Sequence, residues 1–274
     1  MAPRPVAVVV HAYFEEDARV RRKVEALVAA GHPVEVIALR RPGEARLVEQ
    51  GGVRIHHLDV GRHQGAGLGT YLLEYGNFFA RAAIALIRAH RRRPFALVDV
   101  NSLPDYLVFA ALPLRLAGVP IILDLHEAMP EFFESRFPRA SNPIIRTTLR
   151  LQERVSIAAA NAVVTVNDSL AGRLTALGIA PDKVTVVMNS PSTELFSTVG
   201  LPTRAFMADG RLRLVYAGAL TPIYELDVVL GAIARIAADR PELGVTAAIY
   251  GRGDSEPAFR ARAAELGIAD RIDF

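Results

Sequence analysis

The stretch Pro120-Ile-Ile-Leu-Asp-Leu-His126-Glu127 decides how this sequence folds. It is a short apolar run that passes directly into polar, titratable residues. Continuous apolar runs of this length are typical of strands buried on both faces of a parallel sheet. Ligands bind open parallel sheets at the carboxyl ends of the strands. His126 and Glu127 are therefore candidate site residues, whereas we expect Asp124 to be structural and to bond loop amides.

Six other short apolar runs precede residue 190, at residues 6–10, 34–39, 53–58, 96–100, 162–166 and 184–188. Helical stretches alternate with them. Residues 17–30 carry apolar side chains at helical spacing, and Gly31 follows as a C-cap. Another helix is expected to begin at Ser102-Leu-Pro104-Asp105 and to kink at Pro113. This alternation predicts a doubly wound α/β domain over residues 1–190.

The composition changes after residue 190. Residues 191–210 are turn formers without periodicity, which predicts a linker. Strands are then expected at residues 212–217, 245–250 and 271–274, with helices at 225–238 and 256–266. We therefore predict the start of a second Rossmann-like α/β domain over residues 211–274. We expect this domain to be truncated and to expose apolar surface.

Composition excludes several classes of protein. The 274 residues include no cysteine, which excludes disulfides, thiolate metal sites and a catalytic thiol. None of the seven histidines has a metal-ligand spacing, so we expect no metal. The net charge of +3 is too small to indicate nucleic acid. Charged, glycine and proline residues interrupt the most apolar stretch, residues 106–123, so a cytoplasmic protein is expected, with peripheral membrane association left open.

The loop after the first strand, His11-Ala-Tyr13-Phe-Glu-Glu-Asp17, lacks the glycine fingerprint of a dinucleotide site. Arg19, Arg21 and Arg22 follow it. These arginines either bind an anion near the start of the helix or form a solvated helix face. The glycine-rich residues 65–69 lack the frame of a phosphate loop, and we interpret them as a flexible hinge.

Two loops of the second domain could hold a phosphorylated ligand. Tyr216-Ala-Gly218-Ala-Leu-Thr221-Pro-Ile-Tyr224 leads from a strand to a helix, whose first amides can bind a diphosphate. Gly251-Arg252-Gly253 follows the next strand. Its glycines allow close approach of a nucleotide, and Arg252 could meet a phosphate. A simple turn is the alternative.

A basic helix is expected where Arg146, Arg150 and Arg154 recur at a spacing of four residues, with apolar neighbours. Residues 1–190 have a net charge of +5, whereas residues 191–274 have a net charge of −2. The basic helix could lie on anionic lipid. A solvated helix face is the alternative.

Taken together, these motifs resemble glycosyltransferase family 4, a glycogen-synthase-like group of two-domain GT-B sugar transferases. The order and spacing of the motifs are more specific than any one of them. The resemblance runs nearly from end to end, through Asp17-Ala-Arg19-Val-Arg21-Arg22, Asp124-Leu-His126-Glu127, Val187-Met-Asn189-Ser-Pro191, Tyr216-Ala-Gly218 and Gly251-Arg252-Gly253.

The resemblance implies a hexosyl-type glycosyltransferase that moves a sugar from a nucleotide-diphosphate sugar to a glycan or lipid-linked acceptor in polysaccharide or glycoconjugate biosynthesis. Transfer with retention is expected, without metal or other cofactor. His126 would contact the transferred sugar, with Glu127 beside it as the second catalytic candidate. The remaining expected contacts are Gly218, Thr221, Tyr224, Gly251, Arg252 and Gly253 for the donor, and His11, Tyr13, Arg19, Arg21 and Asn101 on the acceptor side.

Two departures from the family pattern keep alternatives open. The family usually has Arg and Lys where this sequence has Ala219 and Tyr224, and we expect Arg252 to replace their charge. A pair of glutamates eight residues apart is missing, which is why we expect a truncated second domain. A non-catalytic nucleotide-sugar-binding or scaffold protein, an inactive fragment and, less favoured, a GT-B epimerase are the alternatives.

Overall fold

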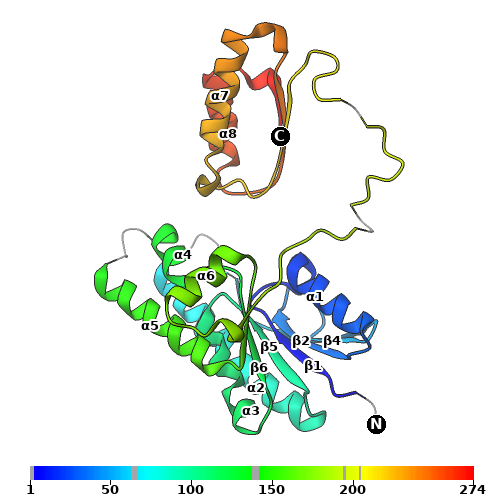
Figure 1. The fold of residues 1–274 in the computed structure, drawn as a ribbon, viewed down its shortest axis with the longest axis vertical. Helices are drawn as coiled ribbons and strands as arrows, with labels where there is room; N and C mark the ends of the chain where they lie inside the picture. The colour runs from blue at the N-terminus through cyan, green and yellow to red at the C-terminus, as the bar shows by residue number, and fades with distance from the viewer. Residues whose placement is uncertain (1–2, 63–66, 138–141, 194–195, 204) are drawn as a thin grey trace. The chain divides into compact units, whose positions relative to one another are not determined.

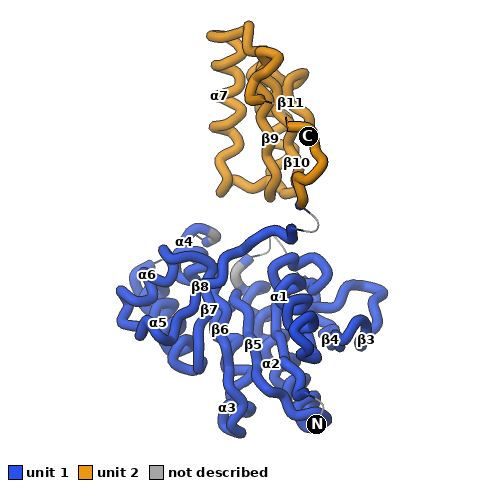
Figure 2. The backbone as a smooth tube through the Cα atoms, turned by 45° about the vertical axis from the view of Figure 1, so that its right-hand side comes forward, with its two compact units in different colours: residues 1–196 blue, residues 197–274 orange. Residues whose placement is uncertain are grey.

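The computed structural model describes residues 3–62, 67–137, 142–193, 196–203 and 205–274 (Figure 1). The chain forms two compact units, Met1–Phe196 and Ser197–Phe274 (Figure 2). Between residues 191 and 210, the described positions contain no helix or strand. Among the described helices, none combines the length and the apolar character needed to cross a bilayer.

An eight-stranded sheet forms the centre of the first unit within its described residues, in the order β3-β4-β2-β1-β5-β6-β7-β8. All neighbouring strands are parallel except the antiparallel pair β3 and β4. The strands are β1 (Val6–Val9), β2 (Val34–Leu39), β3 (Leu47–Gln50), β4 (Val53–Leu58), β5 (Leu97–Asn101), β6 (Ile121–Leu125), β7 (Ala162–Thr165) and β8 (Val184–Val186). The order of strands reverses between β1 and β5, which is where open α/β sheets bind ligands.

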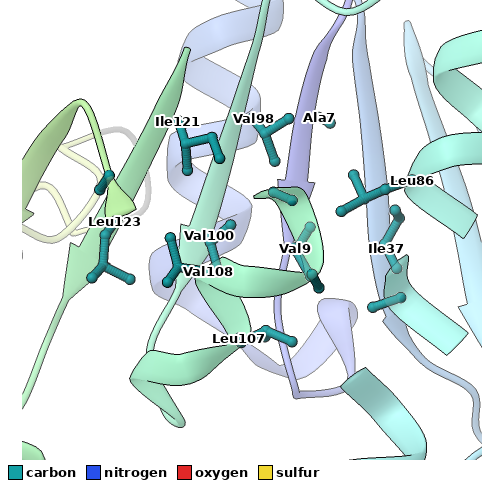
Figure 3. Packing of buried hydrophobic residues seen from close by; sticks show 14 of the residues in the cluster. Ala7, Val9, Ile37, Leu86, Val98, Val100, Leu107, Val108, Ile121 and Leu123 are labelled. Carbon is teal, nitrogen blue, oxygen red and sulfur yellow. The ribbon is translucent and has the colours of Figure 1, made fainter. Parts of the chain in front are cut away.

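Helices cover both faces of this sheet, as the alternating pattern predicted. The helices of the first unit are η1 (Phe14–Glu16), α1 (Ala18–Ala29), α2 (Leu68–Arg92), η2 (Asp105–Ala111), α3 (Leu112–Leu116), α4 (Met129–Arg136), α5 (Pro143–Ala159), α6 (Asp168–Ala176) and η3 (Pro181–Lys183). On one face, α2 and η2 pack on the strands through fully buried side chains such as Leu86 and Leu107, which lie against Val9, Val100 and Ile37 (Figure 3).

On the opposite face, α1 packs on β1 and β2. Its buried side chains Val20 and Val24 meet Val8 and Val36. The helix begins where it does because the carboxylate of Asp17 accepts hydrogen bonds from the backbone amides of Arg19 and Val20. An aspartate N-cap of this kind stabilises a helix by about 1 kcal/mol. The helix and its capped end therefore lie beside the carboxyl ends of the central strands.

Several features differ from the sequence prediction. The antiparallel strand β3 and the 25-residue helix α2 were not predicted. Positions 65 and 66 of the predicted hinge lie outside the described residues, but Leu68 and Gly69 open α2 rather than a loop. The predicted single helix after Ser102 is divided into η2 and α3, because Pro113 lacks the amide that would continue the hydrogen bonding. Ser102 does not cap a helix: its hydroxyl accepts a hydrogen bond from the backbone amide of His126.

The second unit contains a parallel three-stranded sheet, in the order β11-β10-β9. Its elements are β9 (Arg213–Ala217), η4 (Pro222–Tyr224), α7 (Leu226–Asp239), η5 (Pro241–Leu243), β10 (Thr246–Tyr250), α8 (Glu256–Glu265), η6 (Ala269–Arg271) and β11 (Ile272–Asp273). The helices α7 and α8 cover one face of the sheet through Leu230, Ile233 and Phe259. Val215 and Tyr250 are 72% and 63% exposed, so this sheet exposes apolar side chains, as expected.

Candidate functional site

A cavity of about 480 Å³ lies between α1 and the sheet of the first unit. Its floor is formed by the side chains of β1, β5, β6 and β7 that point to the α1 face, and the segment after β8 contributes Val187, Met188, Asn189 and Ser190. Most of the lining is apolar. The polar groups gather at one place, beside the carboxyl ends of β5 and β6.

A buried cluster of charged residues occupies this place. The ammonium of Lys23 on α1 forms an ion pair with Asp99 of β5 and lies 2.7 Å from Oδ2 of Asp124 of β6. It also donates to Oδ1 of Asn101 at 2.7 Å. Asn101 and Asp124 are register partners on neighbouring strands, so their side chains reach the same face of the sheet. The sheet register and one helix position thus bring four polar side chains together.

The charges of this cluster are set by burial and by the ion pairs. Burial alone would lower the pKa of Lys23, but Asp99 and Asp124 outweigh it and raise that pKa. Burial would likewise raise the pKa of Asp124, but His126 and Lys23 outweigh it and lower that pKa. Burial raises the pKa of Asp99 in spite of the neighbouring lysine. The ion pairs therefore favour the charged forms of Lys23 and Asp124, whereas burial favours the protonated form of Asp99.

His126 lies at the end of β6 and lines the cavity. Nε2 of its ring is 3.2 Å from Oδ2 of Asp124, and its side chain is 9% exposed. Both ring nitrogens are buried, and neither forms a hydrogen bond with a described residue. The backbone amide donates to Ser102, which fixes the turn. The described residues therefore leave the hydrogen-bonding capacity of this imidazole unused. Glu127 is exposed one residue further on.

Asp124 is held by side chains, not by the loop amides expected from the sequence. Its carboxylate contacts Lys23 and His126 rather than loop amides, because it sits inside β6 on the α1 face and not beyond the strand. Lys23 and Asp99 were missed altogether. Both residues could have been recognised in the sequence, because Lys23 falls on the apolar stripe of its helix and Asp99 interrupts an otherwise apolar strand. A charge at such a position is costly without a partner, so it marks a paired group.

His11 and Tyr13, the two acceptor-side candidates that follow β1, contact other side chains of the first unit. His11 stacks edge-on against Tyr75 and Phe78 of α2, and its Nε2 lies 3.2 Å from Glu74. Burial and the charge of Arg62 lower the pKa of His11 to about 3, so its ring is neutral at physiological pH. Tyr13 is partly buried, and the guanidinium groups of Arg41 and Arg62 lie 5.4 and 5.5 Å from its ring centroid.

The arginines at the start of α1 divide into two groups. Arg19 and Arg22 line the cavity. Arg19 bonds to Asp17 through its guanidinium at 3.0 Å, and Arg22 donates to the backbone carbonyl of Ser190. Arg21 points away from the cavity and donates to the carbonyl of Glu15 at 3.2 Å. Of the predicted residues, the fold therefore brings Arg19, Asn101 and His126 to one region.

In the second unit, the two predicted glycine loops bind each other. The amide of Leu220 donates to the carbonyl of Arg252 at 3.0 Å, and the amide of Gly218 donates to the carbonyl of Tyr250 at 3.0 Å. A Cβ atom at Gly251 would lie 1.9 Å from the carbonyl oxygen of Gly218, and one at Gly253 would lie 2.1 Å from that of Leu220. Both positions need glycine because another backbone segment occupies the space of a side chain.

The other predicted donor residues lie around the paired loops. Thr221 precedes η4, and Tyr224 at its end is 56% exposed, with its ring centroid 6.5 Å from that of Tyr216. Arg252 is exposed at the tip of the loop after β10. The paired loops thus present one exposed aromatic ring, Tyr224, and one exposed cation, Arg252.

Comparison with known proteins identifies the class. Residues 17–190 match the glycosyl transferase 4-like domain family, so the chain belongs to this family. The match covers the whole region from the N-cap of α1 to the segment that closes the cavity.

The individual relatives agree with this family. The chain is 29% identical over 239 residues to a D-inositol 3-phosphate glycosyltransferase of Stackebrandtia nassauensis, covering 81% of this chain and 52% of that protein. The chain therefore spans about half the length of this curated relative.

Among solved structures, the fold is similar to sucrose-phosphate synthase from Thermosynechococcus elongatus, with a TM-score of 0.73, 17% identity, and coverage of 99% of this chain and 70% of that chain. It is also similar to Anabaena HepE in complex with UDP and glucose, with a TM-score of 0.62, 16% identity, and coverage of 99% and 68%. These likenesses confirm the predicted GT-B type of fold.

Proposed function

We propose that the protein transfers a hexosyl group from a nucleoside-diphosphate sugar to a hydroxyl of a glycan or lipid-linked acceptor. The observation that carries this proposal is the buried imidazole of His126 at the carboxyl end of β6, in a chain of a glycosyltransferase family. Its Nε2 lies 3.2 Å from a carboxylate oxygen of Asp124, and neither ring nitrogen forms a hydrogen bond with a described residue. Such a group can hydrogen-bond a hydroxyl of the transferred sugar.

The chemistry of the proposed transfer follows from these groups. The bond between the anomeric carbon and the diphosphate breaks, the acceptor hydroxyl forms the new bond, and its proton leaves with the diphosphate. Retention of configuration is part of the proposal. His126, oriented by Asp124 and Ser102, positions the sugar. The exposed cation Arg252 and the amides at the start of α7 stabilise the departing diphosphate.

The donor proposal draws support from a structural relative. Anabaena HepE, which shares the fold, was solved in complex with UDP and glucose. By analogy of fold, we assign the paired loops after β9 and β10 to the nucleoside diphosphate. No metal or other cofactor takes part in the proposed transfer, since its positive charges come from side chains and backbone amides.

The acceptor proposal rests on the first unit. Helix α5 exposes Arg146, Arg150 and Arg154 together with the apolar side chains of Ile144 and Leu151, which are 79% and 61% exposed. Exposed arginines beside exposed apolar groups favour an anionic lipid surface. We propose on this ground that the acceptor is lipid-linked. Co-sedimentation with vesicles of phosphatidylglycerol at low salt tests the idea, and an unbound protein would contradict it.

The activity is tested by incubating the full-length product of the gene with a panel of UDP- and GDP-sugars and measuring release of free nucleotide. A sugar-dependent release is expected for one donor. A non-catalytic nucleotide-sugar-binding protein is the alternative, favoured by Ala219 and Tyr224 where related enzymes carry cations. That alternative predicts saturable donor binding with no release.

A further inference from the structure

We propose that Glu15, Glu44 and His57 form a binding site for a divalent transition-metal ion, Zn²⁺. The three residues come from separate elements: Glu15 from η1, Glu44 from the turn between β2 and β3, and His57 from β4. One carboxylate oxygen of each glutamate and one ring nitrogen of the histidine lie within 4.8 Å of one another. The fold thus brings together three ligands of types that zinc accepts.

His57 points into this cluster in a defined orientation. Its side chain is 2% exposed, and its Nδ1 lies 2.7 Å from the backbone carbonyl of Ala45. A carbonyl oxygen can only accept, so Nδ1 carries a hydrogen, and Nε2 is the ring nitrogen that faces the glutamates. Metal-binding histidines are usually held in this way by a carbonyl or carboxylate behind the ring.

Two carboxylates and one imidazole nitrogen face each other in this cluster. Nε2 of His57 lies 3.4 Å from Oε1 of Glu15 and 4.0 Å from Oε2 of Glu44. Both Nε2 of His57 and Oε2 of Glu15 are buried and have no hydrogen-bond partner among the described residues. A cation between the three groups would be attracted by both carboxylates and would give Nε2 of His57 the partner that it lacks.

The spacing suits a small ion. Two ligand atoms at about 2.1 Å from a tetrahedral zinc lie about 3.4 Å apart. The contact between Nε2 of His57 and Glu15 already has this length, whereas Glu44, at 4.0 Å from Nε2, would have to move closer. Water would complete the coordination. A site made of oxygen and nitrogen ligands selects transition metals such as zinc over calcium or magnesium.

The neighbouring cation does not fill the site. The backbone amide of Arg41 donates to Oε2 of Glu44 at 2.9 Å, and its guanidinium lies 3.5 Å from Oε1 of Glu44 and 2.8 Å from Glu16. Arg41 therefore orients Glu44 and offsets one negative charge from outside the cluster. Glu15 still faces His57 without a cation between them, and this is the place that we assign to the ion.

A bound ion would join three segments of the chain. It would attach the segment between β1 and α1, which carries Tyr13, to β4 and to the turn before β3. None of the three ligands lines the cavity that contains His126. The site is therefore separate from the proposed transfer chemistry, and its test does not depend on that activity.

Isothermal titration of chelator-treated protein with zinc sulfate tests the proposal directly. One equivalent of zinc is expected to bind, and Glu15→Gln and Glu44→Gln are each expected to weaken binding by at least tenfold. Glu49→Gln is the matched control, because it removes the same charge from β3, where Glu49 pairs with Arg54 outside the cluster, and it should leave the affinity within about twofold. Cobalt absorption spectra provide a second readout of an oxygen- and nitrogen-ligated site.

The opposite results overturn the proposal. If no saturable binding occurs, His57 is instead the charged partner of the two glutamates. If zinc binds equally well to Glu15→Gln, Glu44→Gln and Glu49→Gln, it binds elsewhere. Both glutamates are partly exposed, so these variants should fold, and unchanged circular dichroism confirms that they do.

Discussion

Nζ of Lys23 lies 2.7 Å from Oδ2 of Asp124, the same oxygen that lies 3.2 Å from Nε2 of His126. One carboxylate oxygen therefore links a lysine of α1 to the histidine at the end of β6. Because the lysine keeps Asp124 ionised, it also sets the charge that the imidazole faces. The position of α1 on the sheet and the electrostatics of the candidate site are thus coupled.

Replacing the lysine tests this coupling. Lys23→Met keeps the length of the side chain but leaves two buried carboxylates without their cation. Removing one partner of a buried ion pair typically costs about 3–5 kcal/mol. We expect the free energy of opening of β5 and β6 to fall by this order, as measured by hydrogen exchange of peptides that cover the two strands.

Arg21→Met is the matched control on the same helix. Arg21 is partly exposed and pairs with Glu25 at 3.8 Å, a surface contact worth less than about 1 kcal/mol. If both variants lowered the free energy of opening of β5 and β6 equally, the loss of any charge on α1 would have this effect. That result would contradict a special role for the buried ion pair.

Asp105 gives the protein a pH-dependent stability. Its side chain is buried in η2, and neither carboxylate oxygen has a hydrogen-bond partner among the described residues. Burial, together with the charge of Glu153, raises the pKa of Asp105 from 3.8 to about 7. The folded protein therefore binds a proton that the unfolded chain releases between about pH 4 and pH 7.

The sign of the effect follows from this difference. The folded state keeps this proton at pH values where the unfolded chain has released it, so the free energy of unfolding falls as pH rises from about 4 to about 7. The total fall is on the order of 4 kcal/mol. Asp105→Asn should remove this fall and be more stable than the wild type at pH 8. Urea unfolding of both proteins at pH 5 and pH 8 measures it, and an identical pH dependence in the two would contradict the assignment.

The close contact between the loops after β9 and β10 predicts that the effect of a Gly→Ala substitution on stability depends on its position. Gly253→Ala would place a methyl group against the carbonyl of Leu220, and we expect a loss of about 2 kcal/mol or more. Gly231→Ala, inside α7 with nothing within 4 Å of its Cβ position, should gain about 0.5–1 kcal/mol. Hydrogen exchange in peptides of β9 and β10 distinguishes them. A harmless Gly253→Ala would show that the close approach is relaxed in solution.

Arg252 is the cation that we assign to the diphosphate. Arg252→Ala should weaken binding of UDP by about tenfold, the loss expected for one charge-assisted contact. Arg260→Ala is the control, since Arg260 is also exposed in this unit but pairs with Glu256 at 2.9 Å. Equal affinities of the wild type and Arg252→Ala in calorimetry would refute the assignment.

The strands and most helices could be predicted because doubly buried strands are continuous apolar runs. Residues 34–39 and 53–58 became β2 and β4 with the predicted bounds. β3 was missed because Leu47–Gln50 is an exposed edge strand whose pairing with β4 depends on the tertiary fold. α2 begins among glycines, which mark turns rather than helices in a sequence.

The candidate site could be located but not assembled from the sequence. His126 was found because a polar residue follows a buried strand. Its partner could not be identified, because the contact with Asp124 depends on which face of β6 each side chain takes. The ion pair with Lys23 joins positions 101 residues apart, and only the register of β5 and β6 and the rotation of α1 bring them together.

The most direct test of the account is a comparison of wild-type protein and His126→Ala, in the full-length gene product, with the preferred nucleotide sugar. If His126 contacts the transferred sugar, turnover should fall by at least a hundredfold while the affinity for free nucleotide changes by less than about threefold. Unchanged turnover in His126→Ala, or an equal loss of nucleotide affinity, would contradict the assignment of His126 to the transferred sugar.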